Sequence, residues 1–465
     1  MTILSSVSAG LLGCSKRPEK LGLAYSSETV AKNVRLLVDE TWVDAEGKRH
    51  VQQEIFESLF EMIDEAEQFI LLDFFLINDF MYEPGSGMRP LSRELVDRLV
   101  AKRKANPEVG ITFITDPVNT VYGSIESPHF KALETAGVQV VLTDLNQLRD
   151  SNPIISKPWR LLLKRWGVAP GNAVDNPMGE GRISMRSMLK LLNFKANHRK
   201  VAVTEKSLLV TSANPHSASS AHWNVALRVD GAGQQMALEA ERAVLEFSDF
   251  KHFSGIGGRR SVGASRHDTA PTERRPPLRL ELLTERKIKD KVLELLANAE
   301  AGTRIDLAMF YFSDRKVARA FISARQRGCN VRVILDPNKD AFGRKKNGIP
   351  NRQTALKLAK AGVPLRWADT HGEQCHVKML HVEHADETAT LLLGSCNYTR
   401  RNMDNFNAEC NLALTAPQAD ANMQRAREAF DRWWSNSDGR TYTVGYETYA
   451  DRSLRRRIRA WLMET

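Results

Sequence analysis

Two short histidine and lysine motifs are the residues in this sequence best suited to chemistry. The first is His198-Arg199-Lys200 and the second is His376-Val377-Lys378. On a β-strand, residues i and i+2 point to the same face, so each motif would set an imidazole beside an ammonium group. A neutral imidazole is a nucleophile and, once protonated, an acid near pH 7, while an ammonium group neutralises an anionic substrate. One such pair is a weak signal, but its repetition indicates a site.

Each pair is followed by the same polar residue types at matching intervals. Asn224 follows Asn214 by ten residues in the first half, and Asn407 follows Asn397 by ten residues in the second. Hydroxyl and amide groups can donate hydrogen bonds to phosphoryl oxygens and hold developing charge in a preorganised site. We therefore expect a phosphodiester to be bound by these six side chains: Ser212, Asn214, Asn224, Ser395, Asn397 and Asn407.

Two histidines allow the chemical work on a phosphodiester to be divided. One would attack phosphorus to give a phosphohistidine, and the other would protonate the leaving alcohol and later deprotonate the incoming one. Lys200 and Lys378 would supply the positive charge, so the scheme requires no metal and no cofactor. His381 and His384, with Glu383 between them, are metal-ligand residue types. On a strand, however, residues 381 and 384 face opposite ways, so we expect no metal site there.

The elements around these motifs also occur twice, which predicts an internal duplication. A helical apolar pattern over 53–66 precedes an apolar run at 69–77, and the same order recurs at 286–299 and 305–312. In each half a later strand leads into an Asp-Pro pair, at Asp116 and Asp336, seven residues before a glycine. This alternation predicts an α/β fold with two tandem domains, each a sheet flanked by helices, related by a pseudo-twofold axis.

Changes in composition divide the chain into segments. Residues 1–20 form a lipoprotein-type signal or a disordered N-terminus, and residues 255–277 form a linker rich in Gly, Ser, Arg and Pro. The first domain is expected at 30–254, the second at 278–440, and a basic C-terminal tail at 441–465. An insert at about 146–194 contains Trp159 and Trp166 among basic residues, which suits either a bilayer interface or an amphipathic helix that caps the domain.

The overall composition describes a folded globular protein. The chain has 465 residues, of which 42% are hydrophobic and 7% aromatic, and its five cysteines show no C-x-x-C spacing. This excludes a disulfide-stapled scaffold and argues against a structural zinc site. No stretch approaches the roughly 20 apolar residues that a membrane-spanning helix needs. A net charge of +10 favours an anionic partner, either a membrane surface or a nucleic acid.

The duplicated motif resembles that of the phospholipase D superfamily, H-x-K-x(4)-D with a downstream G-S-x-N. The resemblance covers roughly residues 30–436, and the string Asn197-His198-Arg199-Lys200 is similar to that of bacterial cardiolipin synthases and related phosphatidyltransferases. It implies two phospholipase D-like domains and one complete, metal-independent active site in a single chain. It favours His198 as nucleophile, with His376 as general acid and base. The catalytic set it implies is His198, His376, Lys200, Lys378 and Glu409.

The chain departs from the family pattern at several positions. Glu205 and Glu383 stand where the family has aspartate, and Thr211 stands where it has glycine. The family's N-x-E is present as Asn407-Ala408-Glu409, but the first half reads Asn224-Val225-Ala226. On this alignment Glu409 would brace His376, and Ala226 would leave His198 without a carboxylate.

These residues support three functions. The leading hypothesis is a phosphodiesterase or phosphatidyltransferase that acts on phospholipids through a phosphohistidine, with an anionic phospholipid or membrane surface as partner. The first alternative is a nuclease of the same superfamily, favoured by the net charge. The second is a membrane-surface binding protein with a degenerate site, favoured by Ala226. Oligomeric state is left open.

The N-terminal residues bear on location. Leu11-Leu12-Gly13-Cys14 is similar to the lipobox of bacterial lipoproteins, in which the cysteine is lipidated. Cys14 is therefore a lipidation candidate, and a membrane-associated place in the bacterial cell envelope is expected. A peripheral membrane protein of the cytoplasm is the alternative, because the n-region lacks the usual basic residues.

Overall fold

The computed structural model describes residues 17–80, 87–150, 173–176, 181–191, 195–250, 278–341 and 344–464. The expectations for Cys14, Trp159, Trp166 and the linker at 255–277 lie outside these residues. Among the helices that the structure describes, none is both long enough and apolar enough to cross a bilayer.

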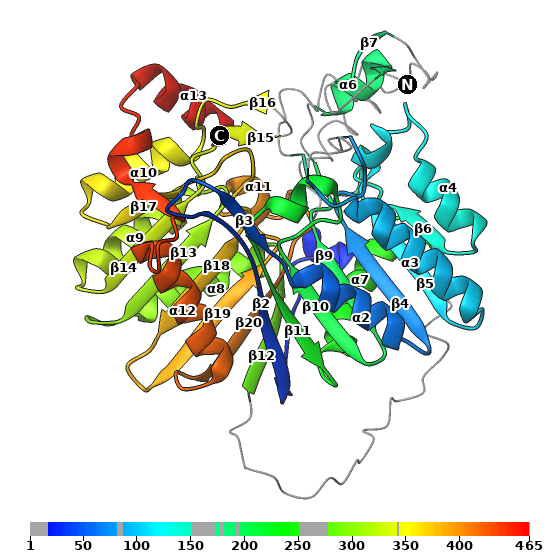
Figure 1. Cartoon of the computed structure of the whole chain (residues 1–465), viewed down its shortest axis with the longest axis horizontal. Helices are drawn as coiled ribbons and strands as arrows, with labels where there is room; N and C mark the ends of the chain where they lie inside the picture. The colour runs from blue at the N-terminus through cyan, green and yellow to red at the C-terminus, as the bar shows by residue number, and fades with distance from the viewer. Residues whose placement is uncertain are drawn as a thin grey trace, which may run out of the picture.

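Two large mixed sheets lie side by side at the centre of the molecule (Figure 1). The eight-stranded sheet has the order β3-β2-β11-β10-β9-β4-β5-β6. Its strands are β2 (Asn33–Val43), β3 (Arg49–Gln52), β4 (Phe69–Phe74), β5 (Gly110–Thr115), β6 (Gln139–Leu142), β9 (Lys200–Thr204), β10 (Ser207–Thr211) and β11 (Asn224–Asp230).

The nine-stranded sheet has the order β1-β12-β20-β19-β18-β13-β14-β17-β21. It begins with β1 (Ser26–Ala31), which comes from the N-terminal part of the chain, and ends with β21 (Thr443–Gly445), which lies in the segment expected to be a tail. The strands between them are β12 (Leu278–Thr284), β13 (Arg304–Met309), β14 (Asn330–Leu335), β17 (Leu365–Ala368), β18 (Lys378–Glu383), β19 (Thr388–Gly394) and β20 (Cys410–Pro417).

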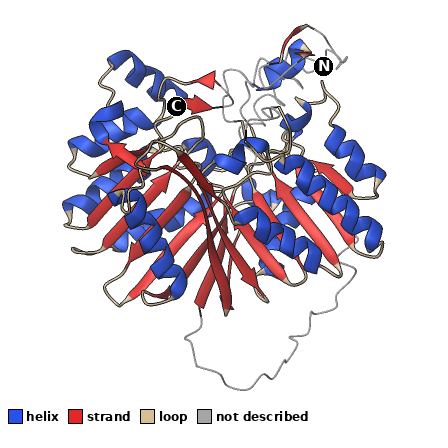
Figure 2. Cartoon of the chain, in the orientation of Figure 1, coloured by secondary structure: helices blue, strands red, loops and turns tan. Residues whose placement is uncertain are grey.

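Helices flank both sheets (Figure 2). Beside the first sheet are α2 (Ile55–Glu65), α3 (Leu91–Ala105), α4 (Pro128–Thr135) and α7 (Gln234–Phe247), whereas α6 (Met185–Leu191) lies beyond the end of the sheet, near β7 (Val174–Asp175), as Figure 1 shows. Beside the second are α8 (Arg286–Asn298), α9 (Arg315–Gln326), α10 (Asn351–Lys360), α11 (Arg400–Met403), α12 (Ala421–Ser435) and α13 (Leu454–Glu464). Two short hairpins complete the described elements: β7 (Val174–Asp175) with β8 (Arg182–Ile183), and β15 (Asp340–Ala341) with β16 (Arg344–Lys345).

The two halves repeat one topology, which confirms the predicted fold class. Strands β4, β5 and β6 are parallel, as are β13, β14 and β17. The strand that follows each histidine motif, β9 or β18, pairs antiparallel with the first strand of its parallel set. Every residue of β4 and of β18 is buried, as expected for strands covered on both faces.

Buried hydrogen bonds connect the two halves. Glu40 on β2 accepts hydrogen bonds from the indole of Trp433 on α12 at 2.7 Å and from the hydroxyl of Tyr442 at 3.1 Å. The main-chain N–H of Leu36 donates to Asn422 at the start of α12. Because a buried polar group is costly when unpaired, these contacts favour one arrangement of the halves.

Candidate active site

Both histidines lie where the two halves meet. His198 precedes β9 and donates its main-chain N–H to the carbonyl of Ala408 in the second half, at 2.8 Å. In a second contact across the interface, Trp223 of the first half donates its main-chain N–H to the carbonyl of Gln374, two residues before His376, at 3.0 Å. Each histidine segment is therefore held by the chain of the opposite half.

This exchange corrects the predicted partner of Glu409. Its carboxylate contacts Nδ1 of His198 at 3.0 Å, whereas Nδ1 of His376 lies 3.2 Å from the side-chain oxygen of Asn224. Glu409 thus braces His198, the histidine expected to lack a carboxylate. The prediction failed because it assumed that each N-x-E serves its own half, while the packing brings each bracing residue across the interface.

The contacts also correct the alignment of the two halves. Ser212 receives the N–H of Val225 and donates to Asn224, while Ser395 receives the N–H of Cys410 and donates to Glu409. Asn224 is therefore the counterpart of Glu409. Asn224 lies 12 residues after Ser212, whereas Glu409 lies 14 residues after Ser395. The loop between these residues is therefore two residues shorter in the first half, and the equal ten-residue spacings, which matched Asn224 with Asn407, concealed this difference.

The two serines, which were predicted to bind phosphate, direct their hydroxyl groups to other side chains of the protein. Both are fully buried, and their hydroxyl protons are used within the protein on Asn224 and Glu409. The amide of Asn402 also donates to Glu409. A carboxylate that accepts several hydrogen bonds is fixed in place. Ser212 and Ser395 are therefore positioning residues for the groups that orient the histidines.

The asparagines of the downstream motif remain suited to the predicted role. Asn214 accepts the main-chain N–H of Leu76 on its oxygen at 3.3 Å. Its Nδ2 and that of Asn397 form no hydrogen bond with the described part of the chain, and neither atom is fully buried. Each amide can therefore donate to a bound oxyanion.

The two lysines face the same buried environment as the histidines. Lys200 donates to the carbonyl of His198 at 2.7 Å and lies 5.4 Å from the ring centre of Phe75. Lys378 donates to the carbonyl of His376 and lies 5.0 Å from the ring centre of Phe310. Burial lowers the pKa of Lys200 to about 7, and burial together with Lys200 lowers that of Lys378. A bound anion would in turn favour the protonated form of both lysines.

Burial also keeps both imidazoles neutral. It lowers the pKa of His198 to about 4 although the charge of Glu409 opposes this, and it lowers that of His376 together with the charge of Lys378. Because Nδ1 of each ring faces an oxygen acceptor, each Nδ1 carries the proton and each Nε2 presents a lone pair. An unprotonated Nε2 is the form that a nucleophile or a base requires.

The Asp-Pro motifs hold the histidine segments from behind. Asp116 accepts the main-chain N–H of Asn197 at 2.8 Å, and Asp336 accepts that of Cys375 at 2.8 Å. Burial raises the pKa of Asp116 to about 7 and that of Asp336 to about 6, against the hydrogen bonds they receive. Both motifs therefore fix the residue that immediately precedes a histidine.

Arg199, between the first histidine and its lysine, is fully buried. It pairs with Glu285 at 2.9 Å and Glu241 at 3.3 Å, and Glu285 in turn accepts the main-chain N–H of Glu409. This ion-paired chain connects the first motif to the residue that braces it. Glu205 and Glu383 lie away from the histidines: Glu205 accepts main-chain N–H groups at the start of β4, and Glu383 pairs with Arg427.

Thr211 and Gly394 show why the two halves differ at the family glycine. Gly394 has φ near +149°, and a Cβ built on it would lie 2.4 Å from the carbonyl oxygen of Cys410. Only glycine fits there. Thr211 ends β10 in regular pairing, and its hydroxyl donates to the carbonyl of Val225 at 3.1 Å.

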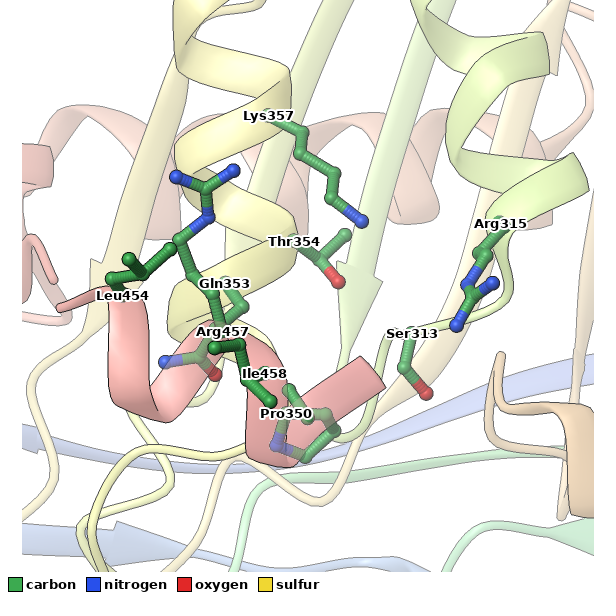
Figure 3. Close-up of a pocket in the computed structure, with 10 residues that line it drawn as sticks. Ser313, Arg315, Pro350, Gln353, Thr354, Lys357, Leu454, Arg457 and Ile458 are labelled. Carbon is green, nitrogen blue, oxygen red and sulfur yellow. The ribbon is translucent and has the colours of Figure 1, made fainter. Parts of the chain in front are cut away.

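Among the described residues no group of histidine, cysteine, aspartate or glutamate is arranged to hold a metal ion. His381 is buried with neither ring nitrogen hydrogen-bonded, and His384 contacts the hydroxyl of Thr390 at 2.9 Å. The cavity in Figure 3, of about 260 Å³, lies elsewhere, between α10 and α13. None of the motif residues lines it, so it is distinct from the site of the paired histidines.

Known proteins are similar to part of this sequence and to its fold. Residues 292–434 match the family model described as "Cardiolipin synthase, PLD-like domain". Mitochondrial cardiolipin hydrolase of Homo sapiens is 30% identical over 153 residues, which are 33% of this chain and 53% of that protein. The chain therefore spans about half the length of that curated relative.

The fold is shared with a solved structure over nearly the whole chain. The crystal structure of phosphatidylserine synthase from Haemophilus influenzae Rd KW20 matches with a TM-score of 0.58 at 12% identity, covering 97% of this chain and 99% of that one. The predicted resemblance is confirmed: residues 292–434 are similar to the PLD-like domain of cardiolipin synthase, and the α/β fold of the two halves is shared with the phosphatidylserine synthase structure.

Proposed function

We propose that this protein is a metal-independent phosphodiesterase or phosphatidyltransferase that acts on phospholipids. The observation that carries the proposal is the crossed pair of braced histidines, His198 on Glu409 and His376 on Asn224. The alternative of a catalytically degenerate binding protein is less favoured, because Ala226 was its basis and Asn224, not Ala226, is the counterpart of Glu409. The phospholipid class is supported by the family description and by the name of the human relative.

In the proposed reaction Nε2 of His198 attacks phosphorus. A new N–P bond forms, the P–O bond to the leaving alcohol breaks, and Glu409 stabilises the positive charge that develops on the imidazole. His376 gives a proton to the leaving oxygen from its Nε2. The charge of the bound phosphodiester raises the pKa of His376 in the complex and so favours that proton.

The second half of the reaction reverses these roles. His376, now neutral, removes a proton from water or from an alcohol, and the resulting oxygen attacks the phosphohistidine and breaks the N–P bond. Water as acceptor gives hydrolysis, and an alcohol gives transfer. The same residues serve both outcomes.

We also propose that the protein works at a membrane surface, because its substrate would reside in a bilayer. The direct test is to incubate the purified protein with phosphatidylglycerol vesicles, with and without glycerol, and to analyse the products by mass spectrometry beside a digestion of single-stranded DNA. Turnover of lipid with intact DNA is expected. Cleavage of DNA with unchanged lipid would show the nuclease instead, and no turnover of either would contradict an enzyme.

A further inference from the structure

A third histidine lies beside the catalytic pair. His222 is buried, and its ring centre is 6.1 Å from that of His376. Nδ1 of His222 accepts the main-chain N–H of Gln374 at 3.2 Å. A ring nitrogen that accepts a hydrogen bond carries no proton, so the neutral ring has its N–H at Nε2.

Asn407 holds the equivalent place in the other half. Its side-chain oxygen accepts the main-chain N–H of Ala196 at 3.1 Å. Ala196 and Gln374 each stand two residues before a catalytic histidine, and His222 and Asn407 each stand two residues before a bracing residue. In both side chains one polar atom, Oδ1 of Asn407 or Nδ1 of His222, accepts an equivalent main-chain N–H. The other polar atom of each side chain can donate a hydrogen bond.

Nε2 of His222 keeps its donor unused within the described part of the chain. No hydrogen bond joins it to those residues, and it is not among the fully buried unpaired atoms, so it is not completely covered. Nδ1 of the neighbouring His216, by contrast, is both fully buried and unpaired. The ring of His222 is otherwise nearly covered, and it lies beside the ring of His376.

We propose that His222 is a substrate-binding residue whose Nε2–H donates to a non-bridging oxygen of the phosphodiester, as the amide of Asn407 does from the opposite half. The inference rests on the proposed phosphodiester function. Burial, with His216 and Lys378 nearby, lowers the pKa of His222 and keeps it neutral. His222 therefore adds a hydrogen-bond donor without adding a positive charge, which would disfavour the protonated form of Lys378.

The test compares His222→Ala with His222→Asn, the residue that the other half uses. Tungstate binding is measured by calorimetry, and kcat and KM are measured on phosphatidylglycerol. Loss of one donor to a charged oxygen should weaken tungstate binding and lower kcat/KM by about 10- to 100-fold in His222→Ala. His222→Asn should stay within about fivefold of the original protein in both measurements.

Two further variants separate this role from packing. His216→Phe removes a neighbouring buried imidazole and should leave tungstate affinity within about twofold, while Asn407→Ala, which removes the equivalent donor of the other half, should weaken tungstate binding about as much as His222→Ala does. Equal tungstate binding in His222→Ala and the original protein would overturn the proposal, as would failure of His222→Asn to retain binding in a folded protein.

Failure of the proposed function would give a different result. If the original protein turns over no phospholipid but binds tungstate through His222, the donor role stands and the substrate class is wrong. If His222→Ala does not fold, the comparison of His222→Asn with the original protein still decides the matter.

Discussion

His198 and His376 sit in matching frames but have different partners. Each follows a main-chain N–H held by an Asp-Pro motif, each precedes a lysine that donates to its carbonyl, and each packs on a phenylalanine. The difference lies at Nδ1, where His198 meets the carboxylate of Glu409 and His376 meets the amide oxygen of Asn224. Duplication has kept the geometry of the two halves while their charges have diverged.

This difference supports the proposed roles of the two histidines. A carboxylate at Nδ1 stabilises a ring that becomes positively charged, as a nucleophile does when it bonds to phosphorus. An amide oxygen fixes the tautomer and the ring orientation without stabilising charge to the same degree, so the ring gives up its proton more readily. The asymmetry therefore fits His198 as nucleophile and His376 as acid and base.

The largest effect is expected from removing either histidine. His198→Ala and His376→Ala should each lower kcat on phosphatidylglycerol by about 10³-fold or more, because neither chemical step proceeds without both groups. Thermal unfolding of each variant checks that the fold persists. More than about a tenth of the activity left in either variant would contradict a shared site.

Removing the charge beside His198 should have the next largest effect. Glu409→Gln keeps the size of the side chain but offers one oxygen to three donors, namely His198, Ser395 and Asn402. A loss of about 10² to 10⁴ in kcat is expected.

The matched control is Glu383→Gln, which removes a carboxylate at the far end of β18, where it pairs with Arg427. Its kcat should stay within about threefold. Equal losses in the two variants would indicate a general effect of charge removal and not a role for Glu409.

Adding a negative charge beside His376 should change kcat less than removing either histidine or the carboxylate of Glu409 does, and it should extend activity to higher pH. Asn224→Asp places a carboxylate at Nδ1 and should raise the pKa of His376, because an opposite charge favours the imidazolium. As the acid, His376 acts while protonated, so activity should persist to higher pH, with kcat changed by about tenfold or less. The pH profile of kcat/KM measures this, and an unmoved basic limb would contradict the assigned role.

The smallest effect is expected for the pH dependence of stability, at His381, a position outside the active site where the two halves differ. His381 on β18 corresponds to Val203 on β9, since each lies three residues after its lysine. Burial lowers the pKa of His381 to about 4 from 6.5, so the unfolded chain binds more protons between these values and the native state loses stability as pH falls through them.

His381→Val removes that proton uptake. Unfolding by urea should show a free energy within about 1 kcal/mol of the original protein at pH 7.5 and about 1 to 3 kcal/mol less acid destabilisation at pH 4. An identical loss of stability on acidification in both proteins would show that His381 is not the group that titrates.

The sequence was sufficient for the fold and for the identity of the paired motifs. The apolar runs at 69–77 and 305–312 contain β4 and most of β13. The two histidine motifs lie close together because each stands at the start of an equivalent strand. Periodicity and duplication are local properties, so they can be read without coordinates.

The partners of the histidines could not be predicted in the same way. Glu409 and His198 are 211 residues apart and belong to opposite halves, so their contact depends on how the halves pack. The register that matches Val225 with Cys410, whose N–H groups the two serines accept, pairs Asn224 with Glu409 and His222 with Asn407, and the equal ten-residue spacing concealed it. Burial of the serine hydroxyls leaves no mark on the sequence.

The account is tested most directly by identifying the histidine that carries phosphate. The protein is mixed with phosphatidylglycerol bearing a labelled phosphate, quenched with alkali to preserve phosphohistidine, digested and sequenced by mass spectrometry. The label is expected on His198, and His376→Ala should still acquire it at a reduced rate. Label on His376 would reverse the roles given to the two halves, and turnover with no labelled histidine would contradict the covalent mechanism.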